Sequence, residues 1–188
     1  GALAGGMDIA AGEYYAWRSL DEPLDMARMA EQMRRNLPPG MMTWGNLIWL
    51  PPSYAHYLER FRAGAYIALA KGARGLLIDG VHRVRDDAEW RWLGRLAREL
   101  QARAPELCQR PSAVPVTCRT PGVVLADVDG PRGRRVLVVN GTREALTAEL
   151  VDGGRRWRVP LRPYGVRVLG WGPEGPETAG RETCAAAF

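Results

Sequence analysis

Carboxylate, amide and aromatic side chains recur at or near the ends of three predicted strands. Glu13 and Asp79 are the candidates for a catalytic carboxylate, and no catalytic pair is assigned from them. Aromatic faces stack on the C–H faces of a sugar, while the sugar hydroxyls require hydrogen-bond donors and acceptors. The combination is therefore compatible with a carbohydrate site. The candidates for binding such a substrate are Tyr14, Tyr15, Asn46, Trp49 and Asp79.

Each of these candidates also has a purely structural interpretation. Glu13 is alternatively a solvated loop charge, and Asp79 is alternatively a carboxylate that caps the following turn. Tyr14, Tyr15 and Trp49 are alternatively packed in the interior. Both interpretations stay open at the level of the sequence.

The histidines and the remaining tryptophans are interpreted as structural. His56 and His82 lack an evident Ser or Cys nucleophile partner, which favours polar loop residues over catalysts. Trp44 precedes Gly45 on a predicted buried strand and is expected in the core. Core or domain-interface positions are also expected for Trp90, Trp157 and Trp171.

Strands and helices alternate in the first half of the chain and must position the candidates. Short apolar runs at 7–15, 41–50 and 75–80 are predicted to be buried strands. Helical periodicity follows each run, and the sequence indicates caps at Ser53 and Asp86 and a stop at Pro105. The repetition predicts a parallel sheet of βα units. The last helix is expected to bury Trp90, Leu93, Ala97, Leu100 and Ala104.

After residue 107 the pattern changes to short β-rich runs separated by turn formers such as Asn140–Gly141. The runs predict a small antiparallel β-sandwich of about six strands. From residue 172 onward the sequence loses periodicity and is predicted to be a disordered tail. The predicted domains are residues 1–107, 113–171 and 172–188. The predicted strands are 114–119, 123–129, 135–140, 145–151, 156–161 and 164–169.

The composition excludes several classes of protein. The 188 residues are 46% hydrophobic and 25% charged, which is typical of a soluble folded chain. No apolar run approaches the roughly 18 residues of a membrane span. The net charge of +5 comes from arginines scattered among acids, so we expect no nucleic-acid partner. Cys108, Cys118 and Cys184 have no metal-site spacing and are expected to be free thiols, and neither a metal nor a cofactor is expected.

Several motifs resemble the end of (β/α)8-barrel glycoside hydrolases, a broad set that includes β-galactosidase-like and related bacterial barrel enzymes. The segment ERFRAGAYIALAKGARGLLID at 59–79 resembles their last helix and strand repeat. The run Ala104-Pro105-Glu106-Leu107 resembles the exit into their C-terminal β domain. VVNGT at 138–142 and VPLRPYGV at 159–166 resemble two strands of that domain. The resemblance covers about residues 7–170.

The resemblance implies the last three βα units of a TIM-type barrel followed by a small antiparallel β-sandwich. It implies a carbohydrate-active protein, the C-terminal part of a hydrolase of O-glycosyl compounds, whose partner is an oligosaccharide or glycoside. The N-terminal barrel half would lie outside the chain, with any signal peptide, so cytoplasmic and secreted locations stay open. We expect the chain alone to be inactive, and the full-length parent to be the enzyme.

The run at 41–50 departs from the resemblance in one respect. In the common retaining barrel families, the nucleophile lies at strand seven and the acid/base at strand four. The run aligned with strand seven contains no Asp or Glu, and strand four lies outside the chain. The alternative is therefore a non-catalytic carbohydrate-binding or structural protein derived from a barrel glycosidase.

Overall fold

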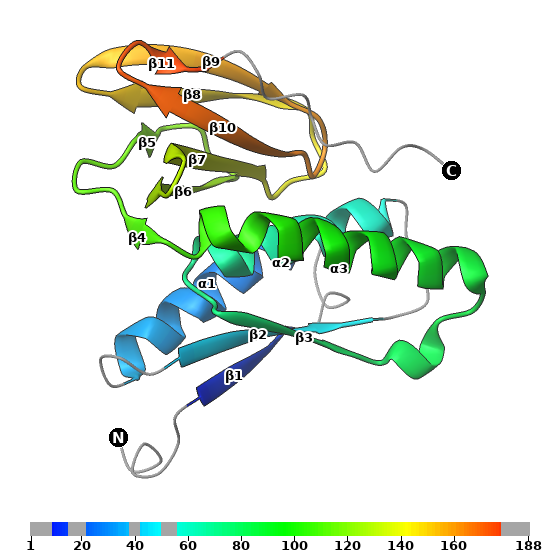
Figure 1. The fold of residues 1–188 in the computed structure, drawn as a ribbon. Coiled ribbons are helices and arrows are strands. Elements are labelled where there is room, and N and C mark those ends of the chain that lie inside the picture. The colour runs from blue at the N-terminus through cyan, green and yellow to red at the C-terminus, as the bar shows by residue number, and fades with distance from the viewer. Residues whose placement is uncertain (1–8, 15–21, 38–41, 50–55, 178–188) are drawn as a thin grey trace.

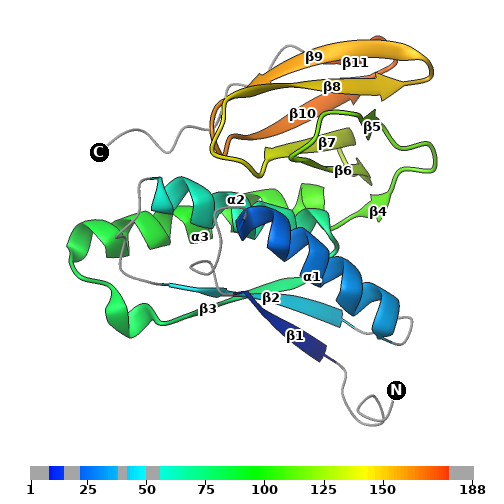
Figure 2. The same cartoon turned by 180° about the vertical axis from the view of Figure 1, so that it is seen from behind.

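The fold has three layers, which Figures 1 and 2 show from opposite sides. The computed structural model describes residues 9–14, 22–37, 42–49 and 56–177. A parallel sheet forms one outer layer, three helices form the middle layer, and an antiparallel β-sandwich forms the other outer layer (Figure 1). The chain therefore combines α/β and all-β structure, as the sequence predicts.

The first layer contains three parallel strands in sequence order, β1-β2-β3. The helices lie on one face of this sheet (Figure 2). The predicted alternation of strand and helix is confirmed. Its elements are β1 (Ile9–Tyr14), α1 (Glu22–Asn36), β2 (Met42–Ile48), α2 (Tyr57–Ala70), β3 (Gly75–Asp79), the short 3-10 helix η1 (Val81–Arg83) and α3 (Asp87–Leu107).

Small residues bring α2 close to the sheet. A Cβ atom added to Gly45 of β2 would lie 2.9 Å from the Cβ atom of Ala68 on α2. Ala68 is one of the small buried residues of α2, with Ala63, Gly64 and Ala65, and small residues allow close packing of a helix on a strand. Gly45 therefore marks the helix-covered face of β2.

The two later helices differ from the sequence predictions at their ends. Helix α2 begins at Tyr57, after His56 in a left-handed conformation with φ of 62°, and the predicted cap Ser53 lies outside the described residues. Helix α3 begins after Asp86, whose carboxylate accepts hydrogen bonds from the N–H groups of Ala88 and Glu89, so this cap is confirmed. The helix continues past Pro105 to Leu107.

The buried face of α3 also differs from the prediction. Trp90 is 51% exposed, and Ala97 is also exposed, so the expectation of a buried Trp90 was wrong. The apolar stripe is displaced around the helix because Trp92, rather than Trp90, begins the buried series at helical spacing. The buried apolar residues of α3 are Trp92, Leu93, Leu96 and Leu107.

The remaining strands form the predicted antiparallel sandwich. The larger sheet consists, in spatial order, of β11 (Gly175–Pro176), β10 (Val166–Gly172), β7 (Gly133–Asn140), β6 (Val123–Gly130) and β4 (Arg110–Pro111). The smaller sheet consists of β5 (Thr117–Cys118), β8 (Leu146–Asp152) and β9 (Arg155–Leu161). Strand β11 pairs with β10, so ordered structure extends into the predicted tail.

The larger sheet has two buried faces. Val124, Leu137 and Val139 belong to the same apolar core as helices α2 and α3. Val136, Val138 and Leu169 point into a second core, between the two sheets. The sandwich is thus fixed to the helical layer by apolar packing. Trp171 and half-buried Trp157 lie in or against the second core, as predicted.

Candidate functional site

The face of the parallel sheet that the helices leave uncovered carries the candidate site. Successive side chains of a strand point to opposite faces. Gly45 and Leu47 contact the helix layer, so Trp44 and Asn46 point to the other face. Ile78 packs on the helix-side core, which places Leu77 and Asp79 on the same face as Asn46. We call this surface, defined by Trp44, Asn46, Leu77 and Asp79, the open face.

Apolar residues surround the polar candidates on the open face. The ring of Trp44 covers Gly75, because a Cβ atom on that glycine would lie 2.6 Å from the indole. Leu77 is 40% exposed. No described strand pairs with the outer edge of β1 or β3. In the described part of the chain, no helix packs on the open face, and no strand pairs with either outer edge of the sheet.

Asn46 is the buried polar residue of this face. Its side chain is 9% exposed, and Oδ1 is a buried acceptor to which no described residue donates a hydrogen bond. Leaving such a group unpaired costs about 1–3 kcal/mol. An N–H or O–H donor from a ligand would satisfy Oδ1, while the side-chain NH₂ group could donate in return.

Asp79 lies at the carboxyl end of β3, one strand from Asn46. Its Oδ1 accepts a 2.6 Å hydrogen bond from the N–H of Gly80, so the side chain does cap the following turn. Its side chain is exposed, and no described residue donates to Oδ2. The structural interpretation of Asp79 is compatible with ligand binding, because one carboxylate oxygen stays available.

The structure brings only part of the predicted set together. In the backbone register, Glu13 is beside Asn46, and Tyr14 is beside Leu47. Tyr15 lies outside the described residues. Glu13 therefore occupies the strand position next to Asn46, while the ligand roles of Glu13, Tyr14 and Tyr15 stay predictions.

Trp49 lies away from Asn46 and Asp79, on the helix side. It is completely buried, with Tyr57 and Phe61 each 5.3 Å away between ring centroids in edge-to-face contact. Its Nε1 has no described hydrogen-bond partner. In this structure the side chain fills the core below α2, which agrees with its packing interpretation.

The histidines and thiols lie elsewhere on the molecule. The His56 ring is 6.4 Å from that of Tyr164, and exposed His82 accepts a hydrogen bond from its neighbour Arg83. Cys108 and Cys118 are free thiols. Within the described ranges, no group of three or more His, Cys, Asp or Glu side chains could hold a metal ion.

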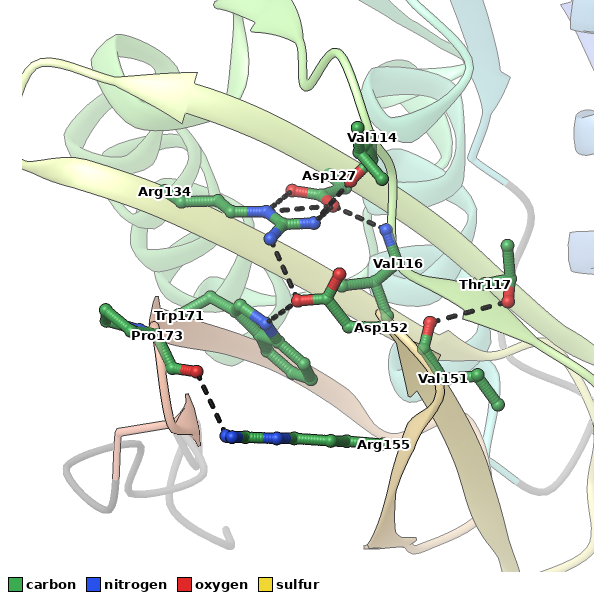
Figure 3. Close-up of polar contacts among 10 residues, drawn as sticks. All are labelled: Val114, Val116, Thr117, Asp127, Arg134, Val151, Asp152, Arg155, Trp171 and Pro173. Atoms are coloured by element: carbon green, nitrogen blue, oxygen red, sulfur yellow. Dashed lines mark hydrogen bonds and ion pairs between the residues drawn. The ribbon is translucent and has the colours of Figure 1, made fainter.

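A charged cluster inside the β-sandwich was not anticipated from the sequence (Figure 3). Arg134 on β7 donates to both carboxylate oxygens of Asp127 and, at 3.0 Å, to Asp152. Asp152 also accepts from Trp171, and Asp127 accepts from the backbone N–H of Val116. The hydrogen bond with Asp127 raises the pKa of the Arg134 guanidinium. Because Arg134 and Trp171 of the larger sheet both bond Asp152 of the smaller sheet, the cluster ties the two sheets together.

A groove of about 800 Å³ opens in the sandwich, where Arg162 and Arg167 line it with Thr147 and Pro160. It is formed by β8, β9 and β10, and it contains none of the predicted site residues. The open face and this groove therefore belong to different layers.

The comparisons with known proteins relate the chain to others only through its fold. No family model matches the sequence, and no curated protein matches it. One similar solved structure is that of AmyP in complex with maltose, with a TM-score of 0.53 and 15% sequence identity. The likeness covers 80% of this chain and 44% of that one, so the chain spans less than half of the AmyP structure.

In the described part of the chain, no helix is both long enough and apolar enough to cross a membrane.

Proposed function

We propose that this chain is part of a carbohydrate-active protein that acts on O-glycosidic bonds, and that the open face binds the sugar. In this proposal, β1, β2 and β3 are three neighbouring strands of a (β/α)8 barrel, and the open face is turned toward the barrel interior. Additional strands from a missing barrel half would pair with the edges of β1 and β3. The β-sandwich supports the barrel through the helices.

The unpaired Oδ1 of Asn46 is the observation that carries the proposal. A buried acceptor on the side of the sheet away from the helices is costly unless another group donates to it. A sugar hydroxyl supplies such a donor, and it can accept from the NH₂ group of the same side chain. Asp79 would accept a second hydroxyl through Oδ2, at the carboxyl end of a strand, where barrel enzymes place their sites.

The arrangement of the elements supports the barrel geometry. Neighbouring strands in sequence order are parallel, and the helices lie on one face, which is the arrangement of consecutive barrel units. The fold likeness to AmyP, whose structure contains maltose, favours a sugar ligand for this chain as well. Trp44 and Leu77 would supply the apolar surface for a sugar C–H face.

The composition of β2 favours a second candidate, a carbohydrate-binding protein without catalysis. Glycoside hydrolysis usually needs two carboxyl groups, about 5 to 9.5 Å apart. Strand β2 has no acidic residue, although strand seven carries the nucleophile in the common retaining barrel families. Such a protein would bind oligosaccharides through the same residues and leave them intact.

An aryl-glycoside assay on the protein as its gene encodes it tests the proposal. Gluco, galacto, manno and arabino substrates are offered to the wild-type protein and to Asn46→Leu. Turnover of one substrate, lowered at least about tenfold in the variant, would support the enzyme. Saturable oligosaccharide binding without turnover would support the second candidate. Neither binding nor turnover would refute both.

A further inference from the structure

The helices of the middle layer form a row that ends with α3. Helix α1 packs against β1 and β2, and α2 packs against β2 and β3, so each covers its own strand and the next strand of the sheet. Helix α2 lies between the other two helices and contacts both. The same arrangement would place α3 between β3 and a further strand, yet no described strand pairs with the outer edge of β3. The row would therefore continue on the side of α3 away from α2.

The side of α3 that faces α2 is marked by Glu99. Its carboxylate accepts hydrogen bonds from Arg62 and from the hydroxyl of Tyr66, both on α2. Trp90 precedes Glu99 by nine residues, which correspond to about two and a half turns of an α-helix. Trp90 therefore lies on the opposite side of α3. Ala97, two residues before Glu99, lies about 200° around the helix from it, on the same side as Trp90.

An outer stripe of five residues runs along this side of α3, which Figure 1 shows on the outside of the helical layer. Its members recur at alternating steps of four and three residues, the spacing of the contact seam between two packed helices. They are Trp90, Gly94, Ala97, Gln101 and Ala104. Trp90 is 51% exposed, Ala97 and Gln101 are also exposed, and the other two are half-buried. This helix-packing pattern is thus largely uncovered within the described part of the chain.

The sizes of these side chains favour a helix as the partner. Gly94, Ala97 and Ala104 allow a second helix to approach closely, while the indole of Trp90 is large enough to insert between side chains of that helix. A glycine inside a helix is less stable than an alanine at the same place. Close contact with a second helix supplies a reason for glycine at position 94.

Positive charge borders the outer stripe. Arg91 and Arg98 are exposed, and neither forms an ion pair with a described residue. Nη1 of Arg98 lies 3.6 Å from the place that a Cβ atom on Gly94 would occupy, so this guanidinium lies beside the stripe. Acidic side chains on a partner helix would pair with these arginines. A second copy packed through the same stripe would bring the same arginines, and repulsion between like charges disfavours that contact.

We propose that the outer stripe of α3 binds the helix of an adjacent βα unit, whose strand pairs with the outer edge of β3. The partner helix runs parallel to α3, because the units of a parallel sheet share one direction. It carries a complementary apolar stripe and places Asp or Glu beside Arg91 and Arg98. The inference rests on the barrel arrangement proposed above, and it names the surface through which α3 joins the missing barrel half. It requires neither sugar binding nor catalysis at the open face.

Photo-cross-linking in the protein as its gene encodes it tests this contact. Trp90 is replaced by benzoylphenylalanine, another large aromatic side chain, and cross-linked peptides are identified by mass spectrometry. We expect a cross-link within one molecule to a segment outside residues 1–188 that has helical periodicity and acidic residues. The matched control carries benzoylphenylalanine in place of Arg95, which is exposed one turn before Glu99 and therefore lies toward α2. The control should not react with that segment.

A mixture of unlabelled and ¹⁵N-labelled protein distinguishes cross-links within one molecule from cross-links between copies. Cross-links between copies, cross-links confined to residues 1–188, equal yields at positions 90 and 95, or no cross-link at all would each overturn the proposal. Glycoside turnover without the expected cross-link would refute this contact alone. The cross-link without sugar binding or turnover would refute the proposed function alone.

A charge reversal tests the acidic partner independently. Arg98→Glu places a carboxylate three residues after Arg95, so without a partner helix the new pair should leave the urea midpoint unchanged or raise it. Beside an acidic partner helix, the same change should lower the midpoint of the encoded protein by at least about 0.3 M. Arg156→Glu makes the same charge change at an exposed residue of the sandwich and should lower it by less than half as much. A midpoint that does not fall in Arg98→Glu, or that falls equally in both variants, would overturn the proposal.

Discussion

The backbone N–H of Trp49 donates a 2.7 Å hydrogen bond to the carbonyl oxygen of Asp79, yet the two side chains lie on opposite sides of the sheet. The bond joins the ends of β2 and β3. The indole of Trp49 fills the core beneath α2, whereas the carboxylate of Asp79 lies at the exposed end of β3. Of these two predicted sugar-binding residues, Trp49 therefore belongs to the core, and Asp79 belongs to the open face.

Replacement of Asn46 by leucine should separate stability from function. Leucine removes the unpaired Oδ1 and keeps a similar volume, so we expect the free energy of unfolding to rise by about 1 kcal/mol. Sugar binding should be lost, because leucine cannot accept a hydrogen bond from the sugar hydroxyl or donate one to it. Urea unfolding and oligosaccharide titration measure the two effects.

Asn140 provides the matched control. It is completely buried, but its NH₂ group donates to the carbonyls of Glu144 and Arg162, and its Oδ1 accepts from Thr142. Asn140→Leu should therefore lower the free energy of unfolding by about 2–4 kcal/mol, since it leaves several partners unpaired. A comparable loss in Asn46→Leu would show that Asn46 is structurally satisfied.

Truncation of Trp49 should affect folding rather than ligand contact. Trp49→Ala leaves a cavity among Tyr57, Phe61 and Trp92, and we expect a loss of about 3–5 kcal/mol in urea unfolding. Trp49→Phe keeps most of the ring packing and sacrifices no described hydrogen bond, so its loss should be smaller. A Trp49→Phe protein that is stable but unable to bind sugar would contradict the assignment of Trp49 to the core.

The sequence predicts the strand that carries Asn46 and leads to Trp49, but it does not show that the two side chains lie on opposite faces of the sheet. The apolar run at 41–50 predicts a strand, but a run covered on both faces has no polar alternation from which its faces can be assigned. Gly45 offered a signal, because close packing of a helix marks one face, and residues 47 and 49 share it. The displaced face of α3 has a similar cause: Trp90 and Trp92 are both apolar, and only tertiary packing decides between them.

The charged cluster of the sandwich could not be predicted, since its members are far apart in the sequence. Asp127→Ala removes the bidentate partner of Arg134, which keeps Asp152, and it leaves the buried N–H of Val116 without its acceptor, so the free energy of unfolding should fall by about 2–4 kcal/mol. The double variant Asp127→Leu, Arg134→Met should recover part of this loss, because it removes the incompletely paired guanidinium but leaves the N–H of Val116 and the carboxylate of Asp152 without these partners. Urea unfolding of the single and double variants measures the recovery, and a double variant no more stable than Asp127→Ala would contradict the account.

Tyr66 should make the protein less stable in alkali. Burial raises the pKa of its hydroxyl, and the negative charge of Glu99 raises it further. The folded state therefore holds this proton at pH values where the unfolded chain, with a pKa of about 10, releases it. The contribution is complete below about pH 10 and is lost as the pH rises above that value. Urea unfolding from pH 8 to 11 should show a steeper decline for the wild type than for Tyr66→Phe.

Sugar binding at the open face is tested most directly by NMR titration of the ¹⁵N-labelled protein with maltose and other disaccharides. We expect saturable shifts of the Asn46 side-chain NH₂ and of the Gly80 amide, beside the Asp79 carboxylate, in the wild type, and we expect the shift of the Gly80 amide to be lost in Asn46→Leu. Saturable shifts confined to other layers, or unchanged binding by Asn46→Leu, would contradict sugar binding at the open face.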